Sequence, residues 1–356
     1  MLSISRWRGL MAGIVVLVMA WQVITLVRAG RAGRWRQAFS WRRWVKAPAT
    51  VGALLLWLVI GALWTSRPRV RLTGVLDSEV VFEIHSHTNA SPDAAAWPAS
   101  RFDLPANLAW HRAAGFDLVF ITDHNTVAAG FAQLSQPEME TGLAVPCRGI
   151  EISSYRSHIL ILGSELPNEP ARYRGSEDRL RELLAVAASR PDIISISSLP
   201  EHRGRTALHA DLGVEAIEIV NASPKGNETQ RDEMSEFIAV AKKHNLAMVA
   251  AGDAHGYGAT TMAWNIIRSE GWRMSPGQGC GAVIEALARG GGNAVQILQR
   301  GKLANDSRWP WIATPLAVVI TTWRSMPQAS LPGWVIWIWM LGWLRRRRET
   351  DAAALP

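Results

Sequence analysis

The stretch HSHTNASPD at residues 85–93 contains two histidines that are one residue apart. It follows an apolar run that predicts a strand, and alternate residues of a strand point to the same face of a sheet. His85 and His87 should therefore present two imidazoles to one place, where Asp93 from the next loop can join them. Such a set could bind a metal ion, although the stretch alone fits two solvated loop histidines equally well.

Other ionisable side chains lie at the ends of predicted strands further along the chain. The segments concerned are FDLVFITDHN, CRGIEIS, SHILILG, IISISSLPEH and AMVAAGDAH. They contribute Asp123, His124, Glu151, His158, His202, Asp253 and His255. A single histidine of this kind is usually an ordinary polar loop residue, but six of the nine histidines share this placement. We therefore expect the fold to gather these side chains.

So many ionisable groups in one place predict bound cations. Burying them together costs free energy unless positive charge compensates the carboxylates. Mixed imidazole and carboxylate ligands suit Zn, Mn or Fe better than Mg or Ca, and the candidates suffice for two or three ions. The remaining histidines, His111, His209 and His244, are expected to have surface roles, since the first and third fall in helical patterns.

The elements that must position these side chains alternate between strands and helices from about Arg69 to Arg308. The strand candidates are residues 80–85, 116–122, 145–152, 158–162, 193–197, 216–220, 247–251, 265–268 and 293–298. The helical patterns are residues 104–114, 177–189, 228–244 and 282–289. This alternation predicts an α/β fold with βαβ units around a parallel sheet. About seven such units favour a barrel, in which chemistry gathers at the C-terminal ends of the strands.

The ordered blocks HSHT, TDHN, GIEIS with HIL, PEH and GDAH resemble the PHP (polymerase and histidinol phosphatase) domain of metal-dependent phosphoesterases, over about residues 78–300. The resemblance implies a distorted (β/α)7 barrel that holds two or three divalent metal ions. The metal ligands that it implies are His85, His87, His124, Glu151, His158, His202, Asp253 and His255.

The sequence departs from the family pattern at two places. Many members have Ser-Asp-Gly after the first block, whereas this chain has Ser91, Pro92 and Asp93, so Asp93 would supply the carboxylate from a position displaced by one residue. Pro200 also precedes His202 instead of following it. Asp123 is expected to lie behind the ligands and to orient a neighbouring imidazole.

The activity that the resemblance implies is hydrolysis of a phosphate ester by a metal-bridging water that attacks phosphorus in line. The sequence has no G-x-S-x-G elbow and no P-loop. Arg203 and Arg205 could hold the substrate phosphate, although solvated loop charges explain them equally well. A metal-dependent amide, ester or carbamate hydrolase, and a non-catalytic membrane-anchored metal-binding module, remain alternative functions.

Uncharged apolar segments flank the predicted barrel. They are residues 10–27, 49–64, 309–323 and 331–344. Residues 10–27 would extend about 27 Å as a helix, nearly the thickness of a bilayer core. We predict spans at about residues 10–27 and 49–64, with a cleaved signal peptide as the alternative for the first, and membrane-associated helices at the C-terminal pair.

The net charge of +8 arises mainly from basic segments beside these apolar regions, at residues 28–46 and in the C-terminal RRRR. A basic stretch with interleaved tryptophans could bind nucleic acid, but between two spans it fits a cytoplasmic loop that faces anionic lipid. We therefore predict a protein of the bacterial inner membrane whose catalytic domain lies on the periplasmic side. Its expected substrate is a small-molecule or lipid-linked ester, and no nucleic-acid partner is expected.

The sequence thus divides into an N-terminal membrane region at residues 1–68, a metallohydrolase domain at residues 69–305 and a C-terminal membrane-associated region with a basic tail at residues 306–356. Its two cysteines, Cys147 and Cys280, are too few for a disulfide scaffold. A single bridge between them is feasible, but no feature of the sequence argues for it.

Overall fold

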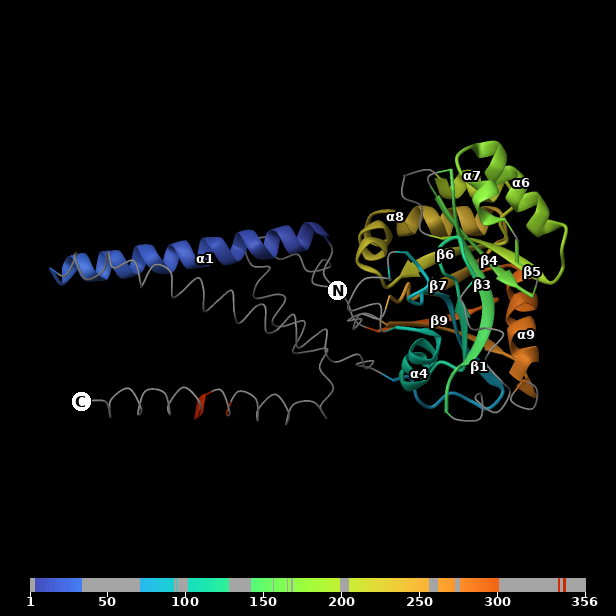
Figure 1. Ribbon diagram of the computed structural model, residues 1–356, viewed down its shortest axis with the longest axis horizontal. Coiled ribbons are helices and arrows are strands. Elements are labelled where there is room, and N and C mark those ends of the chain that lie inside the picture. Colours follow the sequence, from blue (N-terminus) through green and yellow to red (C-terminus); the bar gives the residue numbers. More distant parts are fainter. Residues whose placement is uncertain are drawn as a thin grey trace.

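The computed structural model describes residues 4–33, 71–92, 94, 102–127, 142–155, 157–164, 166–167, 169–198, 205–255, 262–272, 276–300, 339 and 342–343. Within these ranges the chain forms a long N-terminal helix, α1 (Ile4–Arg31), and an α/β unit in which strands and helices follow one another along the sequence (Figure 1). The α/β class predicted from the sequence is therefore confirmed.

The helix α1 includes residues 10–27, the first of the predicted membrane spans. In the part of the chain that the structure describes, no helix combines the length and the apolar character needed to cross a membrane. Residues 49–64 and 309–323, and most of residues 331–344, lie outside the described ranges, so the other predicted membrane segments stay untested.

A mixed sheet of nine strands, in the order β7-β6-β5-β4-β3-β2-β1-β8-β9, forms the centre of the described α/β unit. The strands are β1 (Glu79–Ser86), β2 (Leu118–Ile121), β3 (Val145–Ser154), β4 (Ser157–Gly163), β5 (Ile193–Ser197), β6 (Ala216–Asn221), β7 (Ala247–Ala251), β8 (Met262–Arg268) and β9 (Gln296–Arg300). Each overlaps a strand predicted from the sequence, with its ends shifted by at most a few residues.

The sheet is not parallel throughout, which corrects the expectation from the alternation of strands and helices. The pairings β1–β2, β2–β3, β5–β6 and β6–β7 are parallel. In contrast, β4 runs antiparallel to β3 and β5, and β8 runs antiparallel to β1 and β9. The turn that joins β3 to β4 is too short for a parallel connection, which needs a crossover of about a dozen residues.

The strands β7 and β1 come together at their carboxyl ends, so that the sheet forms a nearly closed barrel. Across this β7–β1 seam the N–H of His87 donates to the carbonyl oxygen of Ala254, and the N–H of Asp253 donates to that of His85, both at 2.9 Å. The side-chain amide of Asn265 on β8 donates to backbone carbonyls of both strands. The seam therefore lies beside the HSHT block.

The connecting helices are α4 (Leu104–Ala114), α6 (Glu177–Ala188), α7 (Arg205–Asp211), α8 (Pro224–Lys243) and α9 (Pro276–Ala288), with a short 3-10 helix, η2 (Pro170–Tyr173). Side-chain caps fix three of their starts, because Asp103, Ser176 and Ser223 each accept a hydrogen bond from an N–H of the first turn. The helices α8 and α9 begin earlier than the sequence pattern predicts, and α7 has no counterpart among the predicted helices.

The helix α9 packs against the inward faces of the strands. Its residues Val283 and Leu287 belong to the same buried apolar cluster as Leu162 of β4 and Ala247 of β7. A disulfide joins Cys147 of β3 to a cysteine of α9 with the two Cα atoms 5.7 Å apart, which answers a question that the sequence left open. Since these strand residues lie far from the carboxyl ends of β1 and β7, α9 covers the opposite end of the barrel.

Two of the three histidines expected on the surface are buried. His111 packs against two aromatic rings, and its Nδ1 lies 2.9 Å from a backbone carbonyl oxygen. His209 lies between the hydroxyls of Ser197 and Ser157, at 2.7 and 3.0 Å. Burial disfavours the charged imidazole and lowers the pKa of each of these two histidines to about 4. His244, at the end of α8, keeps a partly exposed side chain.

Candidate metal centre

The predicted ligands that the structure describes converge at one end of the barrel. Those brought together are His85, His87, His124, Glu151, His158, Asp253 and His255. They come from the carboxyl ends of β1, β2 and β7 and from the hairpin of β3 and β4. In barrels of parallel strands, functional side chains gather at the carboxyl ends of the strands, and these side chains lie at the corresponding end.

Glu151 lies at the centre of this group and is buried. Its Oε2 is 3.0 Å from His85 Nε2, 3.2 Å from His87 Nε2 and 3.3 Å from His124 Nδ1. Its Oε1 is 2.5 Å from His158 Nδ1. The two carboxylate oxygens thus face different imidazoles.

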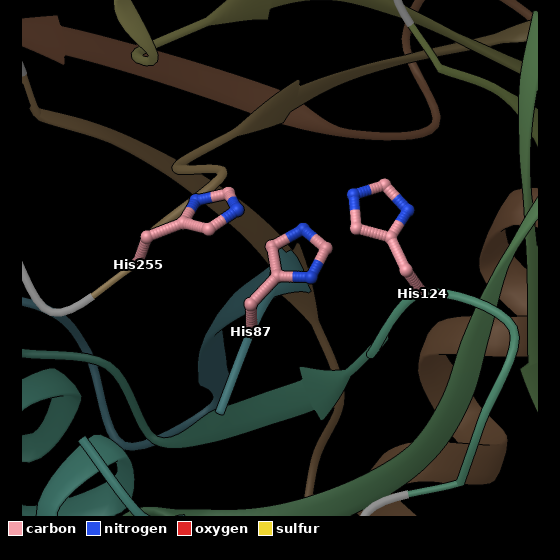
Figure 2. A group of neighbouring side chains, drawn as sticks. All are labelled: His87, His124 and His255. Carbon is pink, nitrogen blue, oxygen red and sulfur yellow. The ribbon is translucent and has the colours of Figure 1, made fainter. Parts of the chain in front are cut away.

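Three imidazoles form a second group beside Glu151. Figure 2 shows His87 between His124 and His255, with the three rings from three different segments of the chain. The ring of His87 stacks on that of His124 with centroids 4.8 Å apart and on that of His255 with centroids 4.2 Å apart. One ring nitrogen of each lies within 4.8 Å of the others. Nitrogen donors therefore face one another across a short distance.

Asp253 brings a second carboxylate to the group from the segment after β7. Its Oδ1 lies 3.3 Å from His87 Nε2, 3.5 Å from His255 Nδ1 and 3.7 Å from His85 Nε2. Its backbone has a φ of 46°, an uncommon conformation for a residue other than glycine. The hydrogen bond from its N–H to β1 holds this conformation at the β7–β1 seam.

The electrostatics of the group depend on close opposite charges. Burial raises the pKa of Glu151, but the charge of His85 and hydrogen bonds from His158 and His85 outweigh it and hold the pKa well below its usual value. Burial lowers the pKa of His87, but hydrogen bonds to Asp253 and Glu151 outweigh it and raise the pKa to about 9. The two carboxylates therefore require positive charge beside them, from protonated imidazoles or from cations.

These donors fit divalent metal ions. Three sets of nitrogen and oxygen atoms each lie within 4.8 Å of one another, and the sets are His87, His124 and His255; His85, His87 and Glu151; and His124, Glu151 and His158. Two ring nitrogens, His85 Nε2 and His87 Nε2, lie only 3.0 Å apart, and two acceptors at this distance need a shared proton or cation. Glu151 belongs to two of these sets, so its carboxylate could contribute a ligand to either.

His85 is held from behind by a carboxylate that the sequence analysis missed. Its Nδ1 lies 2.7 Å from Oε1 of Glu218 on β6, and Glu218 Oε2 accepts hydrogen bonds from Ser198 and Asn221 at 3.2 Å. Because Nδ1–H donates to this carboxylate, Nε2 is left to face the metal site. The only signal in the sequence was an acid within the apolar strand AIEIVN.

A further buried acid, Glu83, also escaped the sequence analysis. Its Oε1 accepts hydrogen bonds from the N–H groups of His85 at 3.0 Å and of Gly252 at 2.9 Å, so it joins β1 to the end of β7. Burial raises the pKa of Glu83 to about 8. Glu83 therefore supports the β7–β1 seam immediately before Asp253.

Polar side chains also hold the HSHT block in place. Asp123 accepts hydrogen bonds from both the N–H and the hydroxyl of Thr88, at 2.6 and 2.8 Å, so these contacts fix Thr88 and not the imidazole that we expected it to orient. The hydroxyl of Ser91 lies 3.2 Å from His87 Nδ1. Asn107 on α4 donates to the carbonyl oxygen of His87 at 2.8 Å.

Three of the predicted site residues, Asp93, His202 and Arg203, lie outside the described residues. Arg205, the other predicted phosphate contact, is the first residue of α7. Its guanidinium lies over the ring of Tyr155 at 4.3 Å from the centroid. Arg205 is thus placed beside the turn between β3 and β4, the two strands that carry Glu151 and His158.

No protein-family model matches this chain, and no curated protein does. Among solved structures, PsfC from Pseudomonas syringae is similar at 16% identity and a TM-score of 0.41, over 70% of this chain and 98% of that one. A two-domain Bacteroides vulgatus protein containing a predicted PHP-like metal-dependent phosphoesterase is similar at 15% identity and a TM-score of 0.39, over 65% of this chain and 68% of that one. An amidohydrolase from Chromobacterium violaceum is similar at 17% identity and a TM-score of 0.32, over 49% and 87%. Because these identities and TM-scores are low, the function of this chain has to be argued from the geometry of its own site.

Proposed function

We propose that this protein is a metal-dependent phosphoesterase, and that its α/β unit is a distorted (β/α)7 barrel of PHP type. The observation that carries the proposal is the position of Glu151, a buried carboxylate whose two oxygens face separate sets of imidazoles. That arrangement suits two or three ions of Zn, Mn or Fe. The proposed ligands are His85, His87, His124, Glu151, His158, Asp253 and His255, with Asp93 and His202 completing the set.

Divalent ions bound there would activate water near neutral pH and neutralise charge on the phosphate and the leaving oxygen. The chain's own residues would do the positioning. Glu218 would keep the proton of His85 on Nδ1, and Glu151 would keep two donor sets at a fixed separation. The pair Asp123 and Thr88 would hold the loop after β1, and so keep His85 and His87 in position.

Substrate classes would be separated by assays of the full-length protein loaded with manganese or zinc. We expect hydrolysis of a phosphomonoester or a phosphodiester, and we expect Glu151→Gln to lower kcat by about 100-fold or more because it removes the bridging charge. The matched control is Glu215→Gln, since Glu215 accepts its hydrogen bonds from Ser195 and contacts none of the proposed ligands that the structure describes. Activity on an aryl ester alone would favour an acyl hydrolase, and metal binding without any hydrolysis would favour a non-catalytic module.

We also propose that the metallohydrolase domain, residues 69–305, works in a periplasm-like compartment. The disulfide between Cys147 and Cys280 supports this location, because disulfides persist in oxidising compartments and are rare in the cytosol. Thiol alkylation in intact cells, before and after reduction, would test it: both cysteines should react only after reduction. The membrane attachment of residues 1–68 and 306–356, and a lipid-linked substrate, remain predictions from the sequence alone.

A further inference from the structure

The hairpin formed by β3 and β4 carries Glu151 and His158 and extends beyond them. In its register Ser153 lies opposite His158, and the chain then turns at Tyr155, whose φ is 42°. A bulky residue held in this left-handed conformation marks a turn that its surroundings fix. The turn therefore forms a defined edge next to the candidate metal centre.

One arginine is fixed on this edge by the segment that follows η2. The hydroxyl of Ser154 donates to the carbonyl oxygen of Tyr173 at 2.5 Å and so ties η2 to the hairpin. The next residue, Arg174, donates from Nε to Asn125 Oδ1 at 3.4 Å. The same amide oxygen accepts a hydrogen bond from the N–H of Ser153 at 3.2 Å. Because Asn125 directly follows His124, the guanidinium of Arg174 lies close to the proposed ligands.

A second arginine reaches the same turn from α7. The guanidinium carbon of Arg205 lies 4.3 Å from the centre of the Tyr155 ring, a cation–π distance. Tyr155 packs partly against the apolar cluster outside the sheet, which limits its motion. The β3–β4 turn is thus flanked by guanidinium groups that come from two separate segments of the chain.

These two arginines differ from most others on the described surface of the α/β unit, where guanidinium groups usually pair with carboxylates. Such pairs are Arg112 with Asp117, Arg172 and Arg179 with Glu182, Arg181 with Glu177, Arg268 with Glu270 and Arg289 with Glu285. Within the described ranges, no carboxylate pairs with Arg174 or Arg205. Their charge is therefore available to an anion from solution.

We propose that Arg174 and Arg205 form an anion-binding rim at the β3–β4 turn, which binds a negatively charged group of the substrate. This inference rests on the proposed function, because the rim borders the proposed metal centre. A guanidinium has a planar fork of donors that matches phosphate and carboxylate oxygens. The rim would make these two arginines specificity-determining residues that select an anionic substrate, bearing phosphate or carboxylate, over a neutral one.

Equilibrium binding tests the rim without any hydrolysis. Inorganic phosphate and succinate would be titrated by calorimetry into the manganese-loaded full-length protein, its Arg174→Met and Arg205→Met variants and the double variant. We expect each single variant to bind inorganic phosphate about tenfold more weakly than the wild type. The matched control is Arg179→Met, whose guanidinium is already paired with Glu182. Binding of phosphate alone would assign the rim to phosphate, and equal loss of succinate binding would assign it to anions in general.

Kinetics separate this inference from the proposed function. With an active phosphoesterase, the rim variants should raise the KM for a phosphomonoester about tenfold, leave kcat nearly unchanged, and leave the KM for a neutral aryl ester unchanged. The rim is refuted if the double variant and Arg179→Met bind inorganic phosphate as tightly as the wild type. Lost phosphate binding in a protein that hydrolyses no phosphoester would keep the rim and overturn the phosphoesterase.

Discussion

At the scale of single residues, the candidate site depends on Glu218, which is not a proposed metal ligand but contacts the proposed ligand His85. Glu218 is buried, and its carboxylate holds His85 Nδ1 at 2.7 Å. Partners of this kind orient a ligating imidazole and raise its basicity. We expect Glu218→Gln to weaken metal binding about 10- to 100-fold, measured by competition with a fluorescent chelator. Glu215→Gln changes a partly buried acid of the neighbouring segment and should bind metal as the wild type does. Equal affinity in both variants would show that His85 needs no such support.

The buried neutral histidines predict how stability depends on pH. Burial lowers the pKa of His111 to about 4, whereas a histidine in the unfolded chain titrates near 6.5. Between these values the unfolded chain binds more protons than the folded one, so the free energy of unfolding falls as the pH falls. Replacing His111 with Gln should remove about 2 kcal/mol of the stability lost between about pH 7 and pH 5. Urea unfolding of the chelated wild type and variant at both pH values measures this difference, and parallel pH profiles would contradict it.

Residue types and strand alternation were sufficient to predict that seven of these side chains gather at one end of the barrel, but not which residues support them. His85 and His87 share a face because they are two residues apart in a strand, which is a local property. Glu218 and Asn107 reach the same block from β6 and α4, and their positions depend on how distant segments pack. Hydrophobic patterns do not encode those distances. For the same reason His209 was expected on the surface, although it is buried against serine hydroxyls of β4 and β5.

At the scale of elements, α9 is attached to the barrel by a covalent link. The disulfide between Cys147 and Cys280 closes a separation of 133 residues, and removing such a link increases the freedom of the unfolded chain. We expect Cys280→Ser to lower the free energy of unfolding by about 2–5 kcal/mol, measured by urea unfolding. A reducing agent should lower the stability of the wild type to that of the variant and leave the variant unchanged. Equal stability of oxidised wild type and variant would contradict this role.

The β7–β1 seam leaves no space at Gly252. A Cβ added there would lie 2.4 Å from Glu83 Oε2, and Glu83 is the acid that joins the two strands. We therefore expect Gly252→Ala to lower the melting temperature and to weaken metal binding, because Asp253 follows directly. The control is Gly281→Ala on the exposed side of α9, where a Cβ meets nothing within 4 Å. It should be neutral or stabilising by up to about 1 kcal/mol, since alanine favours helix. Identical metal binding by Gly252→Ala and the wild type would contradict the role of the seam.

The positions of the strands and the existence of α4, α6, α8 and α9 followed from the sequence because they depend on local periodicity, whereas α7 was missed. The direction of β4 did not follow from the sequence, since it is set by the short turn at Tyr155, and short turns join antiparallel strands. The placement of α9 at the end of the barrel opposite the candidate metal centre depends on packing between segments far apart in the chain. Predicting the disulfide between Cys147 and Cys280 also requires knowing which distant segments pack together, because two cysteines alone have no spacing pattern that indicates a bridge.

At the scale of the whole molecule, the proposed metal ions would hold together segments that the backbone joins only weakly. The donor groups come from β1, from β3 and β4, and from the segments after β2 and β7. Along the β7–β1 seam, hydrogen bonds such as that from Asp253 N–H to the His85 carbonyl lie directly beside the donors. Without cations, the carboxylates of Glu151 and Asp253 depend on protonated imidazoles for compensating charge. Ion binding should therefore mainly stabilise the contact between β7 and β1 that closes the barrel.

Removing the metal tests this coupling between the site and the fold. A ligand at about 100 times its Kd stabilises the folded state by about 2.7 kcal/mol, so chelation should lower the melting temperature by several degrees, and added manganese or zinc should restore it. Hydrogen exchange should accelerate most at the N–H groups of His87 and Asp253, which cross the seam. The N–H groups that pair β4 with β5, on the far side of the sheet, should keep their protection. Uniform loss of protection would show that ion binding stabilises the fold as a whole, and no change on chelation would mean that the barrel closes without metal.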